Sequence, residues 1–199
     1  MVDAVVGKDP SVLARAVPKL SIVAHAHMGR PRLAHYTFNT PGAIGCYLSH
    51  LLCWQKVAAQ KDVCLVVEED MRLDMSVDPV HIIHQAAHAI DKHLFDLVTV
   101  AYSSLPKMSD VADCLVRLIT PFTGTLGYVV GPRGAAQLIK GLGSRIEGHI
   151  DYMIGLFALA VAQDEDPFVL GASGTNCWMI ETNKSLVGHG DNLSSSMNT

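Results

Sequence analysis

Three consecutive carboxylates follow a short apolar run in this chain. Glu68, Glu69 and Asp70 come directly after residues 63–67. Because successive side chains of a strand point to opposite faces, Glu68 and Asp70 would share one face and Glu69 would lie on the other. A carboxylate beside a buried strand needs a cation, a helix N-terminus or solvent, and a divalent metal would meet this need and could also bind a diphosphate. The alternative is a solvated turn in which Arg72 pairs with the acids.

Three further polar residues interrupt apolar segments. Ser49 and His50 stand in the middle of a helical pattern, where His50 either satisfies a buried backbone group or faces a ligand. Asp151 precedes a long apolar stretch, and a carboxylate there can cap the helix. Alternatively, Asp151 is a general base that deprotonates a hydroxyl group, which is a weak nucleophile unaided.

A glycine and an arginine flank the apolar run 128–130. Gly127 would let a ligand approach the backbone closely, and Arg133 at a helix start would offer a cation together with free N–H groups to an anion. The alternative is that the small residues here serve the packing of the helix on a sheet. His189, between two glycines, has an unobstructed ring and is otherwise a histidine of a surface loop.

A run of histidines does not indicate a metal site. His81, His84 and His88 line one helical face, but no cysteine or glutamate completes a closed zinc geometry. The helix that carries them is expected to be exposed. The sequence also contains no phosphate-binding P-loop, GxGxxG turn or nucleophile elbow.

Hydrophobic patterning predicts the elements that would position these groups. Thr40 and Pro41 are typical of a helix start, and apolar residues then recur at helical spacing to about residue 60. Residues 63–67 read as a central strand that is covered on both faces. The other expected elements are strands at 19–24, 95–100, 114–119, 125–130 and 168–170, and helices at 80–92, 132–141 and 150–162. Their alternation predicts an α/β fold with a largely parallel or mixed sheet.

Composition limits the class of protein. The chain has 199 residues, 49% of them hydrophobic and 17% charged, which is typical of a folded domain. We expect a single domain over residues 1–192 and a flexible tail over 193–199. A net charge of −4 argues against nucleic acid or an anionic membrane as the main partner, and no apolar run is long enough to span a bilayer.

The compartment is only weakly indicated. The first residues lack the pattern of a signal peptide. The five cysteines are odd in number and include no Cys-x-x-Cys pair, so we interpret them as buried reduced thiols, which slightly favours the cytoplasm. Glycosylation sequons at Asn183 and Asn192 point the other way, and the localisation is therefore left open.

Two blocks of this sequence resemble the family-25 glycosyltransferases, the group of lipopolysaccharide and procollagen galactosyltransferases. The first block is Gly-Ala-Ile-Gly-Cys-Tyr-Leu-Ser-His at 42–50, followed by Trp54 and by the acids at 68–70. The second runs from Gly127-Tyr128 to Arg133-Gly-Ala and is followed by the isolated Asp151. The similarity covers residues 35–190 and is strongest at 42–73 and 123–151.

The resemblance implies a GT-A-like three-layer α/β/α sandwich with a central mixed sheet. It implies inverting transfer of a hexose, galactose or glucose, from a UDP-sugar to a hydroxyl of a glycan or protein acceptor, with Mn²⁺ or Mg²⁺ as cofactor. The implied site residues are Glu68, Asp70 and His189 for the metal, Ser49, His50, Glu69, Gly127 and Arg133 for the substrate, and Asp151 for catalysis.

Two departures from the family pattern support a second hypothesis. Glu69 stands where relatives usually have Asp, and Met1-Val-Asp-Ala resembles a turn that in the family follows a first βα unit. That unit would contribute a central strand and part of the nucleotide pocket. The alternative to an enzyme is therefore a degenerate, non-catalytic domain that acts as a sugar-binding or interaction module.

Overall fold

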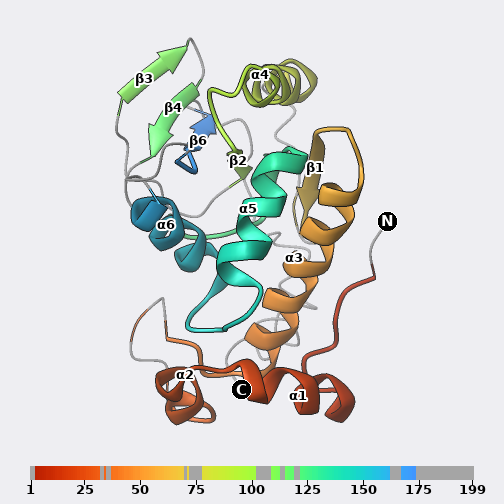
Figure 1. Ribbon diagram of the computed structural model, residues 1–199, viewed down its shortest axis with the longest axis vertical. Helices are drawn as coiled ribbons and strands as arrows, with labels where there is room; N and C mark the ends of the chain where they lie inside the picture. Colours follow the sequence, from red (N-terminus) through yellow and green to blue (C-terminus); the bar gives the residue numbers. More distant parts are fainter. Residues whose placement is uncertain are drawn as a thin grey trace, which may run out of the picture.

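The chain forms one six-stranded sheet with helices on both faces (Figure 1). The computed structural model describes residues 3–31, 34, 37–69, 71, 78–101, 109–112, 115–118, 122–161 and 167–173. The strands are β1 Cys64–Val67, β2 Leu97–Ala101, β3 Ser109–Ala112, β4 Leu115–Leu118, β5 Gly127–Val130 and β6 Leu170–Ser173. The α-helices are α1 Pro10–Ala16, α2 Ile22–His27, α3 Pro41–Ala59, α4 Pro79–Asp91, α5 Pro132–Leu142 and α6 Ile150–Val161, and a 3₁₀ turn, η1, covers Val17–Lys19.

The sheet is mixed, as expected, and mostly antiparallel. Its strand order is β1-β5-β2-β6-β4-β3. Strands β2 and β6 pair in parallel, whereas β1 and β5, β2 and β5, β3 and β4, and β4 and β6 pair antiparallel. In the register of β1 and β5, Cys64 lies opposite Val130 and Val67 opposite Gly127. The carboxyl end of β1 therefore lies beside the amino end of β5.

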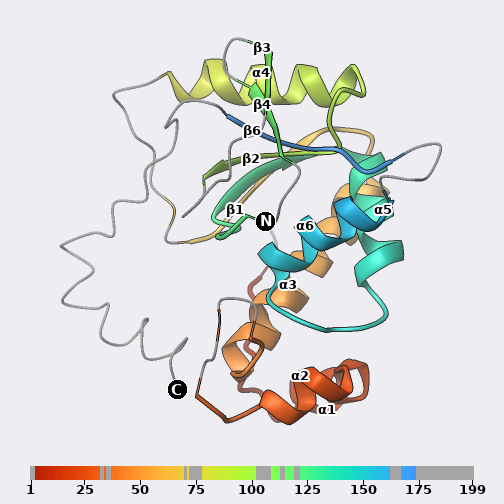
Figure 2. The same cartoon turned by 90° about the vertical axis from the view of Figure 1, so that its left-hand side faces the viewer.

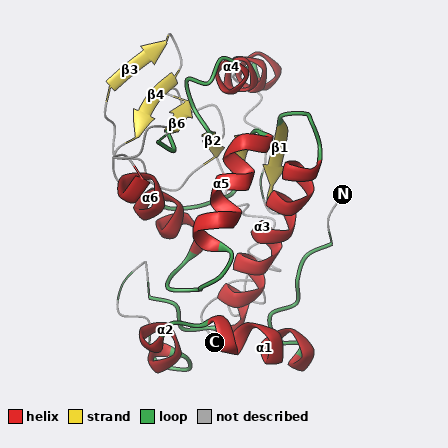
Figure 3. Cartoon of the chain, viewed as in Figure 1, coloured by secondary structure: helices red, strands yellow, loops and turns green. Residues whose placement is uncertain are grey.

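The helices lie on both faces of the sheet, which is compatible with the three-layer sandwich that the resemblance implied. Helix α4 lies over one face of the sheet, while α3, α5 and α6 cover the other (Figure 2). Each interface has its own apolar core, since Trp54 and Tyr128 belong to the cluster on the α3 side and Ile90 and Val98 to the cluster on the α4 side. Helices α1 and α2 lie beyond the sheet at the amino end of α3 (Figure 3).

Helix α3 begins where the local sequence predicts. The Thr40 hydroxyl accepts a hydrogen bond from the N–H of Ala43 at 3.2 Å, and Pro41 occupies the first turn, where a missing N–H costs nothing. The helix continues for 19 residues and buries Tyr47, His50 and Trp54. The helices predicted at 80–92, 132–141 and 150–162 are confirmed as α4, α5 and α6.

The strand predicted at 19–24 is wrong. Residues 17–19 form the 3₁₀ turn and 22–27 form α2, which begins because Ser21 caps it by accepting a hydrogen bond from the N–H of Ala24 at 3.0 Å. A short apolar run is equally compatible with a strand or a helix, and the serine decides between them. In this helix Ile22 and Val23 are exposed.

The position predicted for residues 63–67 is also wrong. The segment is a strand, β1, but it lies at an edge of the sheet and pairs only with β5 among the described residues. Val66 packs into the core on the α3 side, whereas Leu65 and Val67 point to the other face and are 38% and 48% exposed. An unbroken apolar run therefore does not require burial on both faces.

The other strands agree with prediction apart from their ends. Those expected at 95–100, 114–119, 125–130 and 168–170 are β2, β4, β5 and β6, with ends displaced by up to three residues. Strand β3 was not expected, because Ser109 and Asp110 give it a polar start. The predicted tail, 193–199, lies outside the described residues, and no helix within them combines the length and apolar character that a membrane span requires.

Candidate active site

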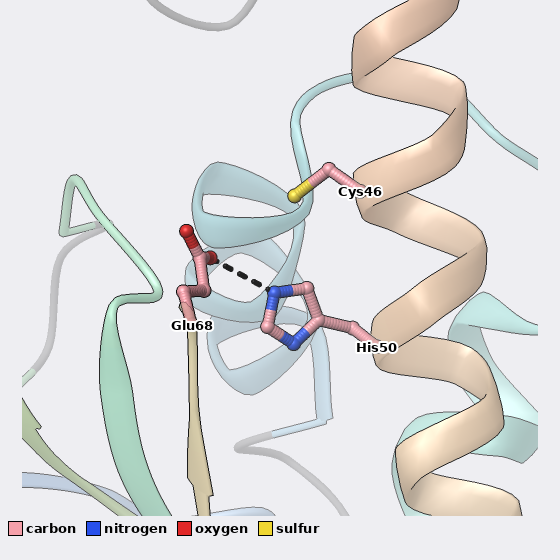
Figure 4. Close-up of side chains that lie close together, drawn as sticks. All are labelled: Cys46, His50 and Glu68. Carbon is pink, nitrogen blue, oxygen red and sulfur yellow. Dashed lines mark hydrogen bonds and ion pairs between the residues drawn. The ribbon is translucent and has the colours of Figure 1, made fainter. Parts of the chain in front are cut away.

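His50 links α3 to the acidic end of β1. Its Nε2 atom lies 3.1 Å from Glu68 Oε1, and its Nδ1 atom lies 2.8 Å from the hydroxyl of Tyr128 on β5 (Figure 4). Glu68 Oε1 also accepts a hydrogen bond from the hydroxyl of Thr125 at 2.7 Å. His50 is 4% exposed, so helix, strand and loop are joined by a buried polar network. Of the residues that the resemblance assigned to the site, the structure thus brings His50 and Glu68 together.

The direction of this network follows from the chemistry of its donors. The indole N–H of Trp54 donates to the Tyr128 oxygen at 2.9 Å. Tyr128 has one proton to donate, and His50 Nδ1 is its acceptor when the imidazole carries its proton on Nε2. In that tautomer Nε2–H donates to Glu68, and each buried group in the series Trp54, Tyr128, His50 and Glu68 is satisfied.

The same contacts hold Glu68 in its ionised form. Burial is the largest influence and raises the pKa of the carboxyl group, but the hydrogen bonds from His50 and Thr125, together with the electrostatic interaction with the His50 ring, outweigh it. The net effect lowers the pKa below its ordinary value of 4.5. Both hydrogen bonds end on Oε1, so neither occupies Oε2.

We predict that Glu68→Gln makes the free energy of unfolding less dependent on pH at acidic pH. A carboxyl group whose pKa is lowered on folding stabilises the protein above its unfolded pKa, and the contribution is lost as the pH falls from about 4.5 through the folded value. The slope of unfolding free energy against pH below 5 should fall by at most about 1.4 kcal/mol per pH unit, the value for one proton.

Urea unfolding at a series of pH values measures this slope. Thr125→Val, which removes one of the two hydrogen bonds to the Glu68 carboxylate, should lose part of the slope. Equal slopes in the wild type and in Glu68→Gln would contradict the assignment.

Asp151 lies beside the same loop. Its Oδ2 atom accepts a hydrogen bond from the N–H of Gly124 at 2.8 Å, and its Oδ1 atom accepts one from the N–H of Tyr152 at 2.7 Å. Gly124 and Thr125 are consecutive, so the carboxylates of Asp151 and Glu68 bond to neighbouring residues. Asp151 opens α6 and is half-buried. The structure thus brings two carboxylates near the end of the sheet at which β1 ends and β5 begins.

Ser49 faces away from the acids. Its hydroxyl accepts a hydrogen bond from the N–H of Val5 at 2.8 Å and donates one to the carbonyl of Gly45 at 2.9 Å. The amino-terminal segment lies so close to the helix at this point that a Cβ on Gly45 would be 2.5 Å from the Val5 carbonyl oxygen. The contacts of Ser49 therefore fasten the amino-terminal segment to α3.

Gly127 lies at the same end of the sheet as Glu68. It pairs with Val67, and a Cβ at this position would lie 2.5 Å from the sulfur of Met71 and 3.1 Å from the Cβ of Ala101. The space beside Gly127 is filled by these side chains, which accounts for the glycine by packing. Glu69 is exposed.

Arg133 lies at the opposite end of β5. Its guanidinium group is 2.9 Å from Oδ1 of Asp96, a buried carboxylate whose Oδ2 accepts a hydrogen bond from the N–H of Val169 at 2.7 Å. Arg133 also lines a pocket of about 270 Å³, together with Lys61 and His93. The structure does not bring Arg133 to the acids.

Two metal-ligand candidates, Asp70 and His189, lie outside the described residues. The histidines 81, 84 and 88 are exposed on α4, as expected. Sequence reasoning did not assign Trp54, Thr125 or Tyr128 to the site. The position of Trp54, one helical turn after His50, was the signal that could have indicated a shared partner.

Comparisons with known proteins identify the family. A family model described as "Glycosyltransferase family 25 (LPS biosynthesis protein)" matches residues 2–154. A Drosophila pseudoobscura pseudoobscura protein named "Glycosyltransferase 25 family member" is 33% identical over 110 residues, which is 53% of this chain and 17% of the relative. A Drosophila melanogaster protein of the same name is 33% identical over 112 residues, 53% of this chain and 18% of the relative. The aligned region thus spans less than a fifth of either relative, whereas the family model matches most of this chain, which belongs to glycosyltransferase family 25.

Proposed function

We propose that this chain transfers a hexose, galactose or glucose, from a UDP-sugar to a hydroxyl of a glycan or protein acceptor. The observation that carries the proposal is that two carboxylates, an ionised Glu68 and Asp151, accept hydrogen bonds from the consecutive residues Thr125 and Gly124 of one loop, in a chain of family 25. Two carboxylates at one edge of a sheet provide for the two needs of this reaction. One would hold the cation that offsets the charge of the departing diphosphate, and the other would remove the proton of the acceptor.

The cation of this reaction would be Mn²⁺ or Mg²⁺. Oxygen ligands suit both ions, and the lowered pKa of Glu68, with Oε2 outside its two hydrogen bonds, fits that role. In the proposal Glu68 and Asp70 hold the ion, with His189 as a third ligand. When bound, it supplies positive charge against the diphosphate leaving group. His50 and Thr125 keep the Glu68 carboxylate oriented.

Asp151 is the proposed general base. The acceptor oxygen attacks the anomeric carbon from the face opposite the diphosphate, the bond to the diphosphate oxygen breaks, and the acceptor proton passes to an Asp151 oxygen. Attack from the opposite face inverts the configuration. Of the proposed substrate-binding residues, His50 lies at this end of β1 and is retained, with Glu69 beside Glu68, whereas packing accounts for Gly127.

A calorimetric titration of UDP with and without Mn²⁺ tests the proposal. We predict that UDP binds measurably tighter with Mn²⁺ than without it, and that Asp70→Asn weakens the Mn²⁺-dependent binding at least tenfold. Asp62→Asn is the matched control, because Asp62 is an exposed acid before the other end of β1 and should leave binding unchanged. Absence of UDP binding in both conditions would contradict the enzyme and favour the non-catalytic sugar-binding or interaction module.

A further inference from the structure

Cys46 projects from α3 toward the same two side chains that define the acidic end of β1. Cys46 and His50 are four residues apart, so they lie one helical turn apart on one side of α3. The ligand atoms of Cys46, His50 and Glu68 all lie within 4.8 Å of one another (Figure 4). His50 is buried, whereas Cys46 and Glu68 are half-buried. The sulfur, the ring nitrogen and the carboxylate therefore lie close to one another, and two of the three residues are partly exposed.

We propose that Cys46, His50 and Glu68 form a binding site for a thiophilic divalent cation of the Zn²⁺ class. One sulfur, one imidazole nitrogen and one carboxylate oxygen are the donors that Zn²⁺ takes, and three protein ligands leave a fourth position open. Mn²⁺ and Mg²⁺ prefer oxygen donors and gain little from a thiolate. The site therefore differs in selectivity from the oxygen-ligated cation of the transfer reaction, and it does not depend on that reaction.

The distances suit a shared ion. His50 Nε2 and Glu68 Oε1 are 3.1 Å apart. Two ligands each about 2.0–2.2 Å from one tetrahedral ion lie about 3.3–3.6 Å apart. A small opening of this pair would admit the ion in place of the proton that the two atoms share. Helix α3 and strand β1 fix the ligands on two packed elements, so little chain entropy is lost on binding.

The surrounding groups supply the outer contacts of such a site. A metal-bound Nε2 requires the imidazole proton on Nδ1, where the Tyr128 oxygen at 2.8 Å would accept it. Trp54 holds that oxygen in place. The thiolate of Cys46 and the carboxylate of Glu68 together carry two negative charges, which balance a divalent ion in a partly buried site. Binding therefore releases the thiol proton of Cys46.

Because Glu68 would serve both cations, Zn²⁺ should compete with Mn²⁺. An ion bound by Cys46 and His50 takes the Glu68 oxygens away from a diphosphate-bound Mn²⁺. We expect micromolar or lower concentrations of Zn²⁺ to remove the Mn²⁺-dependent part of UDP binding. This competition would make binding of the UDP-sugar sensitive to thiophilic metals and to oxidation of Cys46.

Titration of the purified, reduced protein with Co²⁺, in the absence of nucleotide, tests the site directly. Co²⁺ substitutes for Zn²⁺ and reports a thiolate ligand by a charge-transfer band in the near ultraviolet. The wild type should show this band, and Zn²⁺ should displace it. Cys46→Ser should abolish it and weaken Zn²⁺ binding at least tenfold, since loss of an outer-shell partner alone costs about 10–100-fold.

Cys53→Ser is the matched control. Cys53 lies on the same helix, is also half-buried and is seven residues from Cys46, so its replacement should leave the band unchanged. A second measurement uses the wild type alone, in which Zn²⁺ should protect Cys46, but not Cys53, from alkylation followed by peptide mapping. Absence of the band and of protection would overturn the proposal, as would a band that survives in Cys46→Ser. The Co²⁺ titration contains no nucleotide, so its outcome does not depend on UDP binding. A failed Co²⁺ titration would therefore not contradict the proposed function, and a failed UDP titration would not contradict the Zn²⁺ site.

Discussion

Asp151→Asn should lower kcat for hexose transfer by about 10²–10⁴-fold, the range that general bases contribute. The amide cannot accept the proton of the acceptor hydroxyl, so the loss should appear in kcat. Binding of UDP with Mn²⁺ should stay at its wild-type value, because Asp151 bonds to Gly124 and Tyr152 and not to the acids at the end of β1. Steady-state kinetics together with the calorimetric titration separate the two quantities.

The two backbone hydrogen bonds of Asp151 give the residue a structural role as well. Asparagine keeps one acceptor oxygen but turns an amide toward the other N–H, and this should lower the free energy of unfolding by about 1–3 kcal/mol. The matched control is Asp78→Ala. Asp78 caps α4 by accepting hydrogen bonds from the N–H groups of Val80 and His81, so this replacement should cost a comparable amount, about 0.5–2 kcal/mol, without any change in kcat.

Three outcomes then distinguish the roles of Asp151. A large loss of kcat with wild-type UDP binding identifies the base. An unchanged kcat with reduced stability shows that Asp151 only anchors the loop that carries Gly124 and Thr125. Loss of UDP binding as well would show that the loop, and with it the hydrogen bond from Thr125 to Glu68, has moved.

The helix and strand that carry His50 and Glu68 could be predicted because their signals are local. Thr40 and Pro41 mark the start of α3, and an apolar run followed by acids marks the end of β1. The family resemblance assigned the two residues to one site, and in the structure their side chains are 3.1 Å apart. Spacing along the chain alone could not have done so, because the pairing joins a helix to a strand.

The position of Arg133 could not be predicted in the same way. Arg133 follows β5 and Glu68 follows β1. If the two strands were parallel, both residues would lie at the carboxyl ends of the strands, on the same side of the sheet. Since β1 and β5 are antiparallel neighbours, the carboxyl end of one lies beside the amino end of the other, and their two carboxyl ends are a full strand length apart. Strand direction depends on pairings between segments about 60 residues apart, which local patterning does not reveal. The buried partner of Arg133, Asp96, lies in yet another segment.

The hydrogen-bond partner of Trp54 could not be predicted from the sequence either. Its ring is fully buried between α3 and the sheet, and its N–H reaches Tyr128, which is 74 residues away. The tryptophan therefore fills the core and fixes the hydroxyl that orients His50. In the sequence Trp54 stands out only as part of the block that resembles family 25, and its hydrogen-bond partner depends on the register of β5 against β1.

Trp54→Ala should accordingly produce the largest loss of stability among these variants, about 3–5 kcal/mol, because it leaves a cavity in the larger core. For a chain of this size the melting temperature should fall on the order of 10 °C. Trp54→Phe keeps most of the volume and removes the N–H, so it should cost less, about 1–3 kcal/mol. Leu52→Ala, on the exposed side of the same helix, is the control and should change stability by about 0.5 kcal/mol or less.

The comparison of Trp54→Phe with the wild type also tests the hydrogen-bond series. Without the indole N–H, the Tyr128 oxygen no longer has a fixed donor, and His50 should lose its preference for the Nε2–H tautomer. The ¹⁵N chemical shifts of the His50 ring report the tautomer directly. A shift toward a mixture in Trp54→Phe, with wild-type values in Leu52→Ala, would show that Trp54 orients the imidazole and through it Glu68. Identical ring shifts in all three proteins would mean that Trp54 acts through packing alone, and that His50 and Thr125 suffice to hold the carboxylate.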